Sequence, residues 1–316
     1  MKVLVTGCAG FIGSHVSEYL LKNDFDVFGI DNLNDYYDVN RKNENLSILE
    51  KYPKFKFKKD DVCTTRVISG WKPDVICHLA SKSGVRHSIK FPQEYIKDNI
   101  EGFVHIMEEA IKNGKPHVVY ASSSSVYGTS PILPFNEKQP LDYCNSPYAV
   151  SKKTMESYAK MYHQLHQITS IGLRFFTVYG PRGRPDMAPE KFLKGIYRNT
   201  PIDKYGDGYT SRDYTYIDEI VDGVVASIKN QKALKCEVIN LGNNFKCSLN
   251  DFISLCEGIV GKKAIINNLG NQLGDVPHTY ADIDKAIDLL DYDPKTTLKN
   301  GLTKTFEWIS DNINKI

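Results

Sequence analysis

Short apolar runs alternate with longer segments of mixed polarity through the first half of the chain. Runs of this length bounded by polar residues are typical of buried strands, and we expect strands at residues 1–6, 26–30, 55–58, 75–79, 117–122 and 169–175. The segments between them predict helices, of which the clearest lie at residues 14–21, 93–113 and 148–166. Because parallel strands need crossover helices, this alternation predicts a doubly wound parallel sheet of the α/β class.

The pattern changes after residue 177. A loop rich in glycine and proline spans residues 180–185, and shorter elements of mixed character continue to residue 316. We therefore expect a first domain at residues 1–177 and a smaller C-terminal α/β substrate domain at residues 178–316. Segments near residues 213–242 are expected to return to the first sheet, so the division is not one clean cut.

A glycine-rich turn follows the first expected strand. Gly7, Gly10 and Gly13 permit a tight turn, close approach of backbone to a pyrophosphate and close packing of helix on strand. The N-terminus of the following helix offers unpaired N–H groups to phosphates. Asp31 lies 18 residues after Gly13, close to the ~20 typical of the acid that binds an adenosine ribose. Since this carboxylate would repel a 2′-phosphate, the sequence predicts NAD rather than NADP.

A tyrosine and a lysine four residues apart, Tyr148 and Lys152, indicate acid–base chemistry. On a helix these positions share a face, and a nearby ammonium lowers the pKa of a phenol from its unperturbed value of about 10. A hydroxyl from the serine run at residues 122–125 could hydrogen-bond the same substrate oxygen. This arrangement suits proton transfer at a sugar or alcohol hydroxyl, although the spacing alone also occurs on exposed helix faces.

Several candidate segments lie where expected strands end. The glycine turn, Asp31, Asp61 with Val62, residues 79–81 and residues 122–123 all occupy such positions. In doubly wound sheets, ligands bind beyond the carboxyl ends of the strands. These separate segments therefore predict a single crevice.

Composition and charge exclude several classes of protein. The chain has 316 residues, of which 41% are hydrophobic and 25% charged, and its formal net charge is +2. We therefore expect neither a nucleic-acid nor a membrane partner, since no apolar stretch reaches the ~18 residues that span a bilayer. The seven cysteines are scattered without Cys-x-x-Cys pairs, which predicts neither disulfides nor a metal site. A strand at the N-terminus, in place of a signal peptide, predicts a cytoplasmic protein.

Six further stretches carry a family resemblance, at residues 31–39, 84–86, 172–181, 183–188, 212–218 and 274–282. Together with the glycine turn and Tyr148–Lys152, they resemble the extended short-chain dehydrogenase/reductase family, a Rossmann-fold family. Within it the similarity is to nucleotide-sugar epimerases and dehydratases, and it is greatest to the UDP-glucuronate 4-epimerases. The resemblance runs over essentially the whole chain. It implies a homodimer that pairs the helices at 93–113 and 148–166 of each subunit.

The resemblance also implies a reaction and its residues. A UDP-sugar is epimerised at C4 by an isomerase that holds NAD tightly: Tyr148 takes the proton of the 4-hydroxyl, and the C4 hydride moves to NAD and returns to the other face of the 4-keto sugar. The implied catalytic residues are Ser123, Tyr148 and Lys152. The implied cofactor-binding residues are Gly7, Gly10, Phe11, Ile12, Gly13, Asp31, Asn32, Asp61, Val62, Leu79, Ala80, Ser81, Lys82, Asn99, Ser122, Tyr148, Lys152 and Phe175. The implied substrate-binding residues are Arg86, Ser124, Ser125, Thr177, Arg184, Lys191, Tyr205, Arg212 and Asp275.

Two positions favour UDP-glucuronate, whose product is UDP-galacturonate. Ser124 and Ser125 replace the Asp and Glu of 4,6-dehydratases, and serine cannot supply that acid and base. Thr177 stands where UDP-glucose epimerases and UDP-glucuronate decarboxylases usually carry Asn, and with Arg184 it could receive a carboxylate. Holding this anion would suppress loss of CO2 from the 4-keto intermediate, which is a β-keto acid.

Other readings stay open. Lys82 resembles the lysine of galactose-type epimerases, and Arg182 and Lys191 depart from the glucuronate group. Arg182 and Lys191 could hold an acidic sugar together with Arg184, or they could be solvated loop charges. The alternatives are a 4-epimerase of UDP-glucose or UDP-N-acetylglucosamine and, less favoured, a UDP-glucuronate decarboxylase or a 4,6-dehydratase. A non-enzymatic NAD sensor on the same fold is disfavoured by the intact acid–base residues.

Overall fold

The centre of the molecule is a parallel sheet of seven strands. The computed structural model describes residues 1–230, 234–270 and 272–314. Every neighbouring pair in this sheet is parallel, in the order β10-β6-β5-β4-β1-β2-β3. The strands are β1 Lys2–Thr6, β2 Asp26–Asp31, β3 Phe55–Lys59, β4 Val75–His78, β5 His117–Ser123, β6 Ser170–Phe175 and β10 Cys236–Leu241. The predicted doubly wound α/β fold is confirmed.

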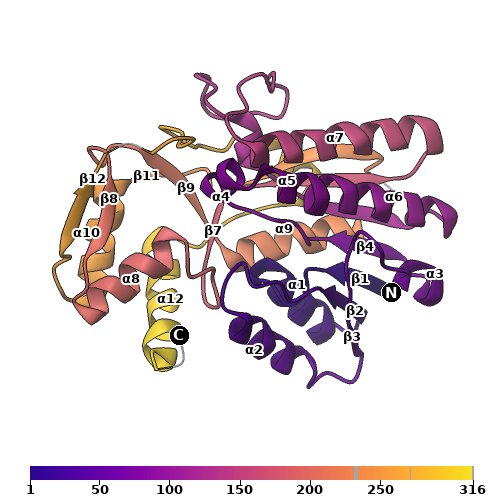
Figure 1. Cartoon of the computed structure of the whole chain (residues 1–316), viewed down its shortest axis with the longest axis horizontal. Helices are drawn as coiled ribbons and strands as arrows, with labels where there is room; N and C mark the ends of the chain where they lie inside the picture. Colours follow the sequence, from indigo (N-terminus) through magenta and orange to yellow (C-terminus); the bar gives the residue numbers. More distant parts are fainter. Residues whose placement is uncertain (231–233, 271, 315–316) are drawn as a thin grey trace.

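Helices cover both faces of this sheet (Figure 1). On one face lie α1 (Phe11–Lys22), α2 (Val39–Leu49) and α9 (Ile217–Lys229). On the other lie α3 (Val67–Trp71), α6 (Gly102–Lys112) and α7 (Pro147–His166). The inner strands are therefore buried on both sides, which explains why they are nearly continuous apolar runs. The edge strand β3 is partly exposed and alternates phenylalanine with lysine.

The helix expected at residues 93–113 is interrupted. It consists of α5 (Pro92–Tyr95), a π-helical segment (Ile96–Glu101) and α6, and it follows the short helix α4 (Val85–Lys90). Inside the π-helical segment the buried Asn99 amide bonds the backbone of Lys82 and the hydroxyl of Ser151. Such π-segments often mark functional sites, and this one fixes the loop that follows β4.

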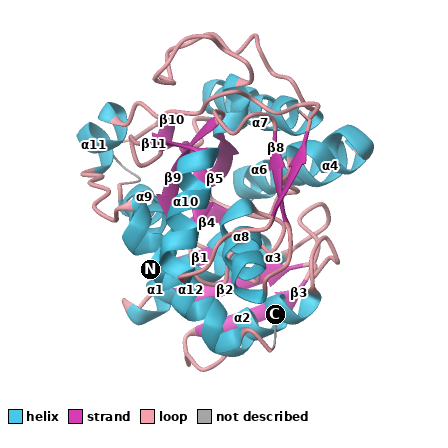
Figure 2. Ribbon diagram, turned by 90° about the vertical axis from the view of Figure 1, so that its left-hand side faces the viewer, coloured by secondary structure: helices cyan, strands magenta, loops and turns pink. Residues whose placement is uncertain are grey.

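Smaller elements at one end of the molecule form the remainder (Figures 1 and 2). A three-stranded sheet contains β7 (Thr177–Tyr179), β9 (Ser211–Tyr216) and β11 (Lys246–Ser248), and a two-stranded sheet contains β8 (Ile202–Tyr205) and β12 (Ile266–Leu269). The helices of this part are α8 Ala188–Arg198, α10 Leu249–Val260 and α12 Leu298–Asn312, whereas α11 Asp284–Leu290 packs on β10 and α9 of the larger part.

The chain crosses between the two parts more than once. β10 returns to the main sheet beside β6, and α9 packs on α1, whereas β9 stays in the three-stranded sheet. The segment near residues 213–242 thus returns only in part. The boundary after residue 177 stays a prediction.

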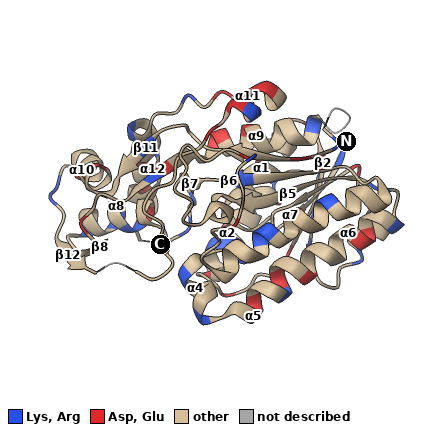
Figure 3. Cartoon of the chain, turned by 90° about the horizontal axis from the view of Figure 1, so that it is seen from above, with Lys and Arg blue, Asp and Glu red and all other residues tan. Residues whose placement is uncertain are grey.

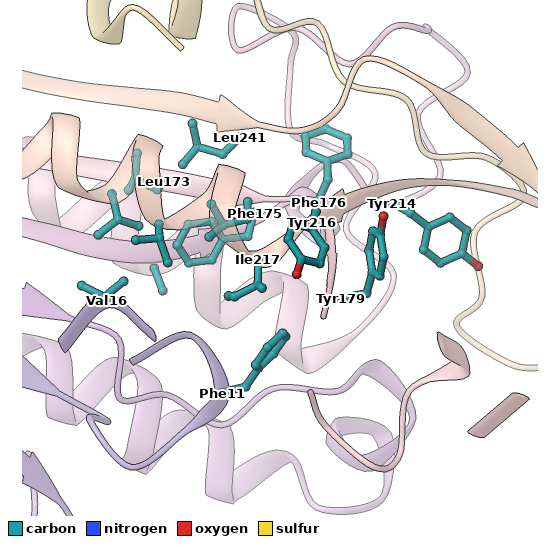
Figure 4. Close-up of a cluster of buried hydrophobic side chains, with 14 of the residues drawn as sticks. Phe11, Val16, Leu173, Phe175, Phe176, Tyr179, Tyr214, Tyr216, Ile217 and Leu241 are labelled. Carbon is teal, nitrogen blue, oxygen red and sulfur yellow. The ribbon is translucent and has the colours of Figure 1, made fainter. Parts of the chain in front are cut away.

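One apolar core continues through both parts (Figure 4). Phe11 from the start of α1 approaches Ile217 of α9, while Tyr179 and Tyr216 extend the cluster toward the smaller sheets. Tyr179 and Tyr216 contact each other edge to face, with 5.7 Å between ring centroids. Because both parts contribute side chains to this core, close packing fixes their positions relative to each other.

Basic residues lie along α4, and acidic and basic residues both lie along α6 (Figure 3). Within residues 1–230, 234–270 and 272–314, no helix combines the length and the apolar character that crossing a bilayer requires.

A buried ion pair joins α2 to α8. Arg41 donates a hydrogen bond from each terminal nitrogen to the carboxylate of Glu190, both at 2.6 Å, and another to the carbonyl of Gly183 at 2.8 Å. The side chains are only 8% and 4% exposed. A pair of this kind is costly to break, because one partner alone leaves an uncompensated buried charge.

We expect Glu190→Gln to lower the free energy of unfolding by about 3–5 kcal/mol, since Arg41 would remain buried without its counter-ion. Urea denaturation measures this change. Lys54→Ala is the matched control, because it breaks the exposed pair with Asp24 and should leave the unfolding midpoint unchanged. Equal midpoints for Glu190→Gln and the wild type would contradict the role of the buried pair.

Candidate active site

A cavity of about 1390 Å³ opens at the carboxyl ends of the parallel strands, between the sheet and the smaller part. With the exception of Asn99, every site residue predicted from the sequence lines it. Those residues are Gly7, Gly10, Phe11, Ile12, Gly13, Asp31, Asn32, Asp61, Val62, Leu79, Ala80, Ser81, Lys82, Arg86, Ser122, Ser123, Ser124, Ser125, Tyr148, Lys152, Phe175, Thr177, Arg184, Lys191, Tyr205, Arg212 and Asp275. Asn99 lies behind the wall, where its amide bonds the backbone of Lys82.

The glycine turn leaves no room for side chains. Gly7 has a φ of +72°, and a Cβ there would lie 2.8 Å from the backbone nitrogen of Ala80. A Cβ on Gly13 would lie 2.0 Å from the carbonyl oxygen of Gly7. Gly10 precedes α1 without a side-chain cap, and the first turn of α1 holds no acidic residue. The uncapped N–H groups of this helix therefore suit the pyrophosphate of a dinucleotide.

Asp31 is held rigidly at the end of β2. Its carboxylate accepts hydrogen bonds from the backbone nitrogens of Ala9, at 3.2 Å, and Leu33, at 2.8 Å. Each carboxylate oxygen has two lone pairs, so both keep acceptor capacity for ribose hydroxyls. The turn, the helix and this acid together fit NAD.

The acid–base residues are positioned by β5 and α7. Ser123 ends β5, and Tyr148 lies in the first turn of α7, which Ser146 caps by accepting from the nitrogen of Ala149 at 3.2 Å. Ser123 lies close enough to Tyr148 for its hydroxyl to act on the pKa of the phenol. Lys152, one turn along α7, donates to the carbonyl of Ala121 at 2.6 Å and lies 5.9 Å from the centroid of the Tyr148 ring.

The pKa of Tyr148 differs from the expectation. Burial raises the pKa of this phenol above its ordinary value, although the hydrogen bond with Ser123 and the charge of Arg184 act to lower it. Burial also lowers the pKa of Lys152 to about 7, opposed by the Glu156 charge. Lys152 is not among the groups that shift the pKa of Tyr148 here, so its predicted effect on this phenol stays a prediction. Desolvation outweighs the spacing of the two residues, and Arg184 supplies the nearby positive charge.

A second buried ion pair lies beside the end of β5. Arg174 of β6 binds both carboxylate oxygens of Glu156, at 2.9 and 2.7 Å. The Ser122 hydroxyl donates to the same carboxylate at 2.6 Å. Ser122 thus lines the cavity while its hydroxyl serves the internal network rather than facing a ligand.

The opposite wall carries charged contacts across the two parts. Arg86 of α4 donates to Asp275 at 2.9 Å, and its guanidinium lies 4.3 Å from the centroid of the Tyr205 ring. Arg212 donates to the carbonyl of Ser211 at 2.9 Å. Lys82 pairs with Glu94 at 2.6 Å, so its charge is already engaged at the cavity wall. Arg forks of this kind suit a diphosphate.

Arg184 stands at the centre of contacts that the sequence did not reveal. Its guanidinium donates to both oxygens of Asp186 and to the hydroxyls of Ser83 and Tyr36. Asp186, Ser83 and Tyr36 also line the cavity. Tyr36 belongs to a stretch that carried the family resemblance, and that membership was the one available signal for it.

Gly84 makes room for this group, and Arg182 lies apart from it. A Cβ on Gly84 would lie 2.4 Å from the Tyr36 hydroxyl oxygen, and this glycine has a φ of +103°. Arg182, which could have held an acidic sugar, is instead paired with Glu18 at 2.6 Å and is absent from the cavity wall. Of these two arginines, Arg184 is therefore the one that lines the cavity.

The sequence profile of the NAD dependent epimerase/dehydratase family matches residues 3–242. The chain belongs to this family. It is 42% identical to the UDP-glucuronate 4-epimerase of Thermodesulfobacterium geofontis (strain OPF15), over 99% of this chain and 97% of that protein. It is 39% identical to Protein CapI of Staphylococcus aureus over the full length of both.

Solved structures show the same fold. The crystal structure of UDP-glucuronic acid 4-epimerase from Bacillus cereus, in complex with UDP-glucuronic acid and NAD, aligns with a TM-score of 0.94 and 38% identity. The alignment covers 98% of this chain and 99% of that chain. The resemblance found in the sequence and the assignment of NAD as cofactor are confirmed.

We expect Ser123→Ala to lower kcat/KM about 10–100-fold, which is the range for losing one hydrogen bond to a charged group. The hydrogen bond from Ser123 lowers the pKa of Tyr148, so its loss should move the ascending limb of the pH profile to higher pH. Ser47→Ala, at an exposed serine of α2, is the control. An ascending limb that keeps its position in Ser123→Ala would contradict this coupling.

Proposed function

We propose that the protein is an NAD-dependent isomerase that inverts C4 of UDP-glucuronate, through a 4-keto intermediate, to give UDP-galacturonate. The observation that carries this choice of sugar is Arg184. Its guanidinium lines the cavity and lies close enough to Tyr148 to influence the pKa of the phenol. UDP-glucuronate carries its carboxylate on C5, next to the reacting C4. A cation beside the acid–base residue therefore suits this sugar.

Each step of the chemistry can be assigned to residues of this chain. NAD, when bound, supplies the acceptor and donor for the C4 hydride. Tyr148 takes the proton of the 4-hydroxyl and returns it after the sugar has turned over. Ser123 shares the 4-oxygen and holds the phenol in place. Lys152 lies below the ring of Tyr148, where its donors are available to a ribose.

The carboxylate must be protected while C4 is a ketone. A 4-keto uronate is a β-keto acid, which loses CO2 when the electrons of its C5–C6 bond can enter the ketone. Thr177 and Arg184 both line the cavity, and together they can bind the carboxylate in an orientation that opposes this loss. Ser124 and Ser125 offer hydroxyls rather than the acid and base that 4,6-dehydration needs.

A second candidate is C4 epimerisation of a neutral UDP-hexose or UDP-N-acetylhexosamine. It is favoured by Lys82, which resembles the lysine of galactose-type epimerases, and by a solved relative, the UDP-glucose 4-epimerase with UDP-glucose from Thermotoga maritima, at 29% identity and a TM-score of 0.88. The pairing of Lys82 with Glu94 weakens this reading, because the lysine is engaged by the protein itself.

The test is incubation with UDP-glucuronate, UDP-glucose and UDP-N-acetylglucosamine separately, with products resolved by proton NMR. We expect UDP-galacturonate from the first and little or no turnover of the others. Turnover of a neutral sugar alone would establish the second candidate. No turnover of any sugar by protein that binds NAD would contradict both.

We expect Arg184→Ala to raise KM for UDP-glucuronate about 10–100-fold, the range for losing a hydrogen bond to a charged group, and to increase the share of decarboxylated product. Arg182→Ala is the matched control, since it removes a guanidinium two residues away that is paired with Glu18 and lies off the cavity wall. It should leave KM and products unchanged. If Arg184→Ala acts on UDP-glucuronate at the wild-type rate, Arg184 does not bind the substrate carboxylate.

We further propose a homodimer formed through the outer face of α6 and α7, which lie side by side in Figures 1 and 3. On α7, Val150 and Leu165 are 49% and 67% exposed. Tyr158 and Met161 share this helix face and are half-buried, whereas Tyr162 faces the core. These apolar side chains lie along one stripe at helical spacing, as an interface requires.

Light scattering after gel filtration should give the mass of a dimer for the wild type and of a monomer for the double variant Val150→Glu/Leu165→Glu, because two carboxylates in an apolar interface would be desolvated. Phe245→Glu, which alters an exposed phenylalanine elsewhere, is the control and should remain dimeric. A monomeric wild type would contradict the proposal.

A further inference from the structure

The carboxylate-binding candidate Arg184 already holds a carboxylate of its own chain. Its Nε donates to Asp186 Oδ1 at 3.0 Å, and its Nη2 donates to Asp186 Oδ2 at 2.5 Å. This is a bidentate pair, the geometry that binds a carboxylate most specifically. The Asp186 side chain is 42% exposed and the Arg184 side chain 18% exposed, so the pair lies at the cavity wall rather than in the core.

Few donors of Arg184 remain for a substrate. A guanidinium has five N–H groups. Asp186 takes two, the Tyr36 hydroxyl accepts from Nη2 at 3.4 Å, and the Ser83 hydroxyl accepts from Nη1. Among the described residues, no acceptor is found for the second N–H of Nη1. Unless Asp186 moves away, a substrate carboxylate can receive one hydrogen bond from Arg184 and not a bidentate pair.

The local backbone holds the two residues together. The nitrogen of Met187 donates to the carbonyl of Arg184 at 3.2 Å, which closes a turn with Pro185 and Asp186 at its centre. Proline is favoured at the second position of such a turn because its ring fixes φ. The guanidinium also rests 5.4 Å from the centroid of the Tyr36 ring. The turn therefore presents Arg184 in one orientation before substrate arrives.

We propose that Asp186 is a positioning residue that directs Arg184 toward the substrate carboxylate along a single N–H and thereby sets the partition of the 4-keto intermediate between epimerisation and decarboxylation. This inference rests on the proposed function. Asp186 touches Arg184 and not the reacting atoms, so its effect is exerted through the orientation of the guanidinium. It also offsets part of the positive charge of Arg184, so the uronate is oriented without being bound too tightly to turn over in the cavity.

The competing loss of CO2 starts from the 4-keto uronate, and because the hydride taken from C4 is then not returned, each 4-keto pentose released consumes one NAD. In the 4-keto uronate the C5–C6 bond breaks, its electron pair enters the C4 carbonyl as an enolate, and C6 leaves as CO2. A proton then adds to C5. This loss is fastest when the C5–C6 bond stands perpendicular to the plane of the C4 carbonyl, because only then can its electrons overlap the π system. A guanidinium fixed in direction can keep the carboxylate out of that orientation.

The test is Asp186→Asn, compared with Asp186→Glu, in the full chain with NAD and UDP-glucuronate. Asparagine is tolerated in turns and keeps the size of the side chain, but its NH2 group opposes the donors of Arg184. We expect the ratio of the decarboxylated 4-keto pentose to UDP-galacturonate, measured by proton NMR, to rise about 10-fold in Asp186→Asn. Both kcat for epimerisation and KM should fall, because asparagine neither directs Arg184 nor offsets its charge. Asp186→Glu, which retains the carboxylate, should restore part of the wild-type ratio.

Controls separate this inference from the proposed function. Asp24→Asn, at an exposed aspartate, should leave the product ratio unchanged, and thermal unfolding should show that Asp186→Asn is folded. If the wild type makes UDP-galacturonate but Asp186→Asn gives the wild-type ratio, the role of Asp186 is overturned and the proposed function stands. If the wild type does not act on UDP-glucuronate, both are overturned.

Discussion

The proposed reaction requires the Tyr148 phenol to lose a proton in a place where burial opposes the resulting charge. Desolvation of this kind disfavours the ionised form of any acid, and only nearby donors and positive charges can offset it. Ser123 and Arg184 provide these, while Lys152 is itself largely desolvated. In the proposed reaction, the residues around Tyr148 therefore share one task, which is to stabilise a phenolate in a buried position.

Stabilising a phenolate requires that the residues around Tyr148 keep fixed positions. Ser123 comes from β5, Tyr148 from α7 and Arg184 from a loop beyond β7. These elements lie in different parts of the chain, and the continuous apolar core of Figure 4 fixes them relative to one another. The buried pairs Arg174–Glu156 and Arg41–Glu190 add directional contacts on either side of the cavity. A buried charge pair tolerates little displacement, because separation exposes each charge to a medium that cannot solvate it.

The sequence predicted the parts of this arrangement that depend on local spacing. The glycine spacing predicted the dinucleotide turn, and at Gly7 and Gly13 only glycine fits. Tyr148 and Lys152 were placed on one helix face because positions four apart always share one. Which strands end at the cavity followed from the parallel sheet itself.

The rest depended on contacts between distant segments, which no local pattern encodes. Asn99 was expected at the cofactor, yet a π-helical segment turns it toward the backbone of Lys82. The pKa of Tyr148 depends on how much of the chain covers it, and coverage is a property of the whole fold. Arg182 and Arg184 are indistinguishable by type and lie two residues apart, but only the structure shows that one pairs with Glu18 and the other faces the cavity.

The contact between Arg184 and Asp186 shows how a short loop can serve both binding and chemistry. A free arginine in the cavity would attract a uronate strongly but would leave the direction of the carboxylate open, since its long side chain has many rotamers. An arginine paired within its own turn loses some of that attraction and gains a fixed direction. For a substrate that must rotate while it is a β-keto acid, direction matters more than strength, because tight binding in the wrong orientation would favour both retention of the sugar and loss of CO2. In the turn at Pro185, the neighbouring Asp186 weakens the attraction of Arg184 for a carboxylate and fixes the direction of its guanidinium. The chain itself therefore orients the guanidinium before any ligand is bound.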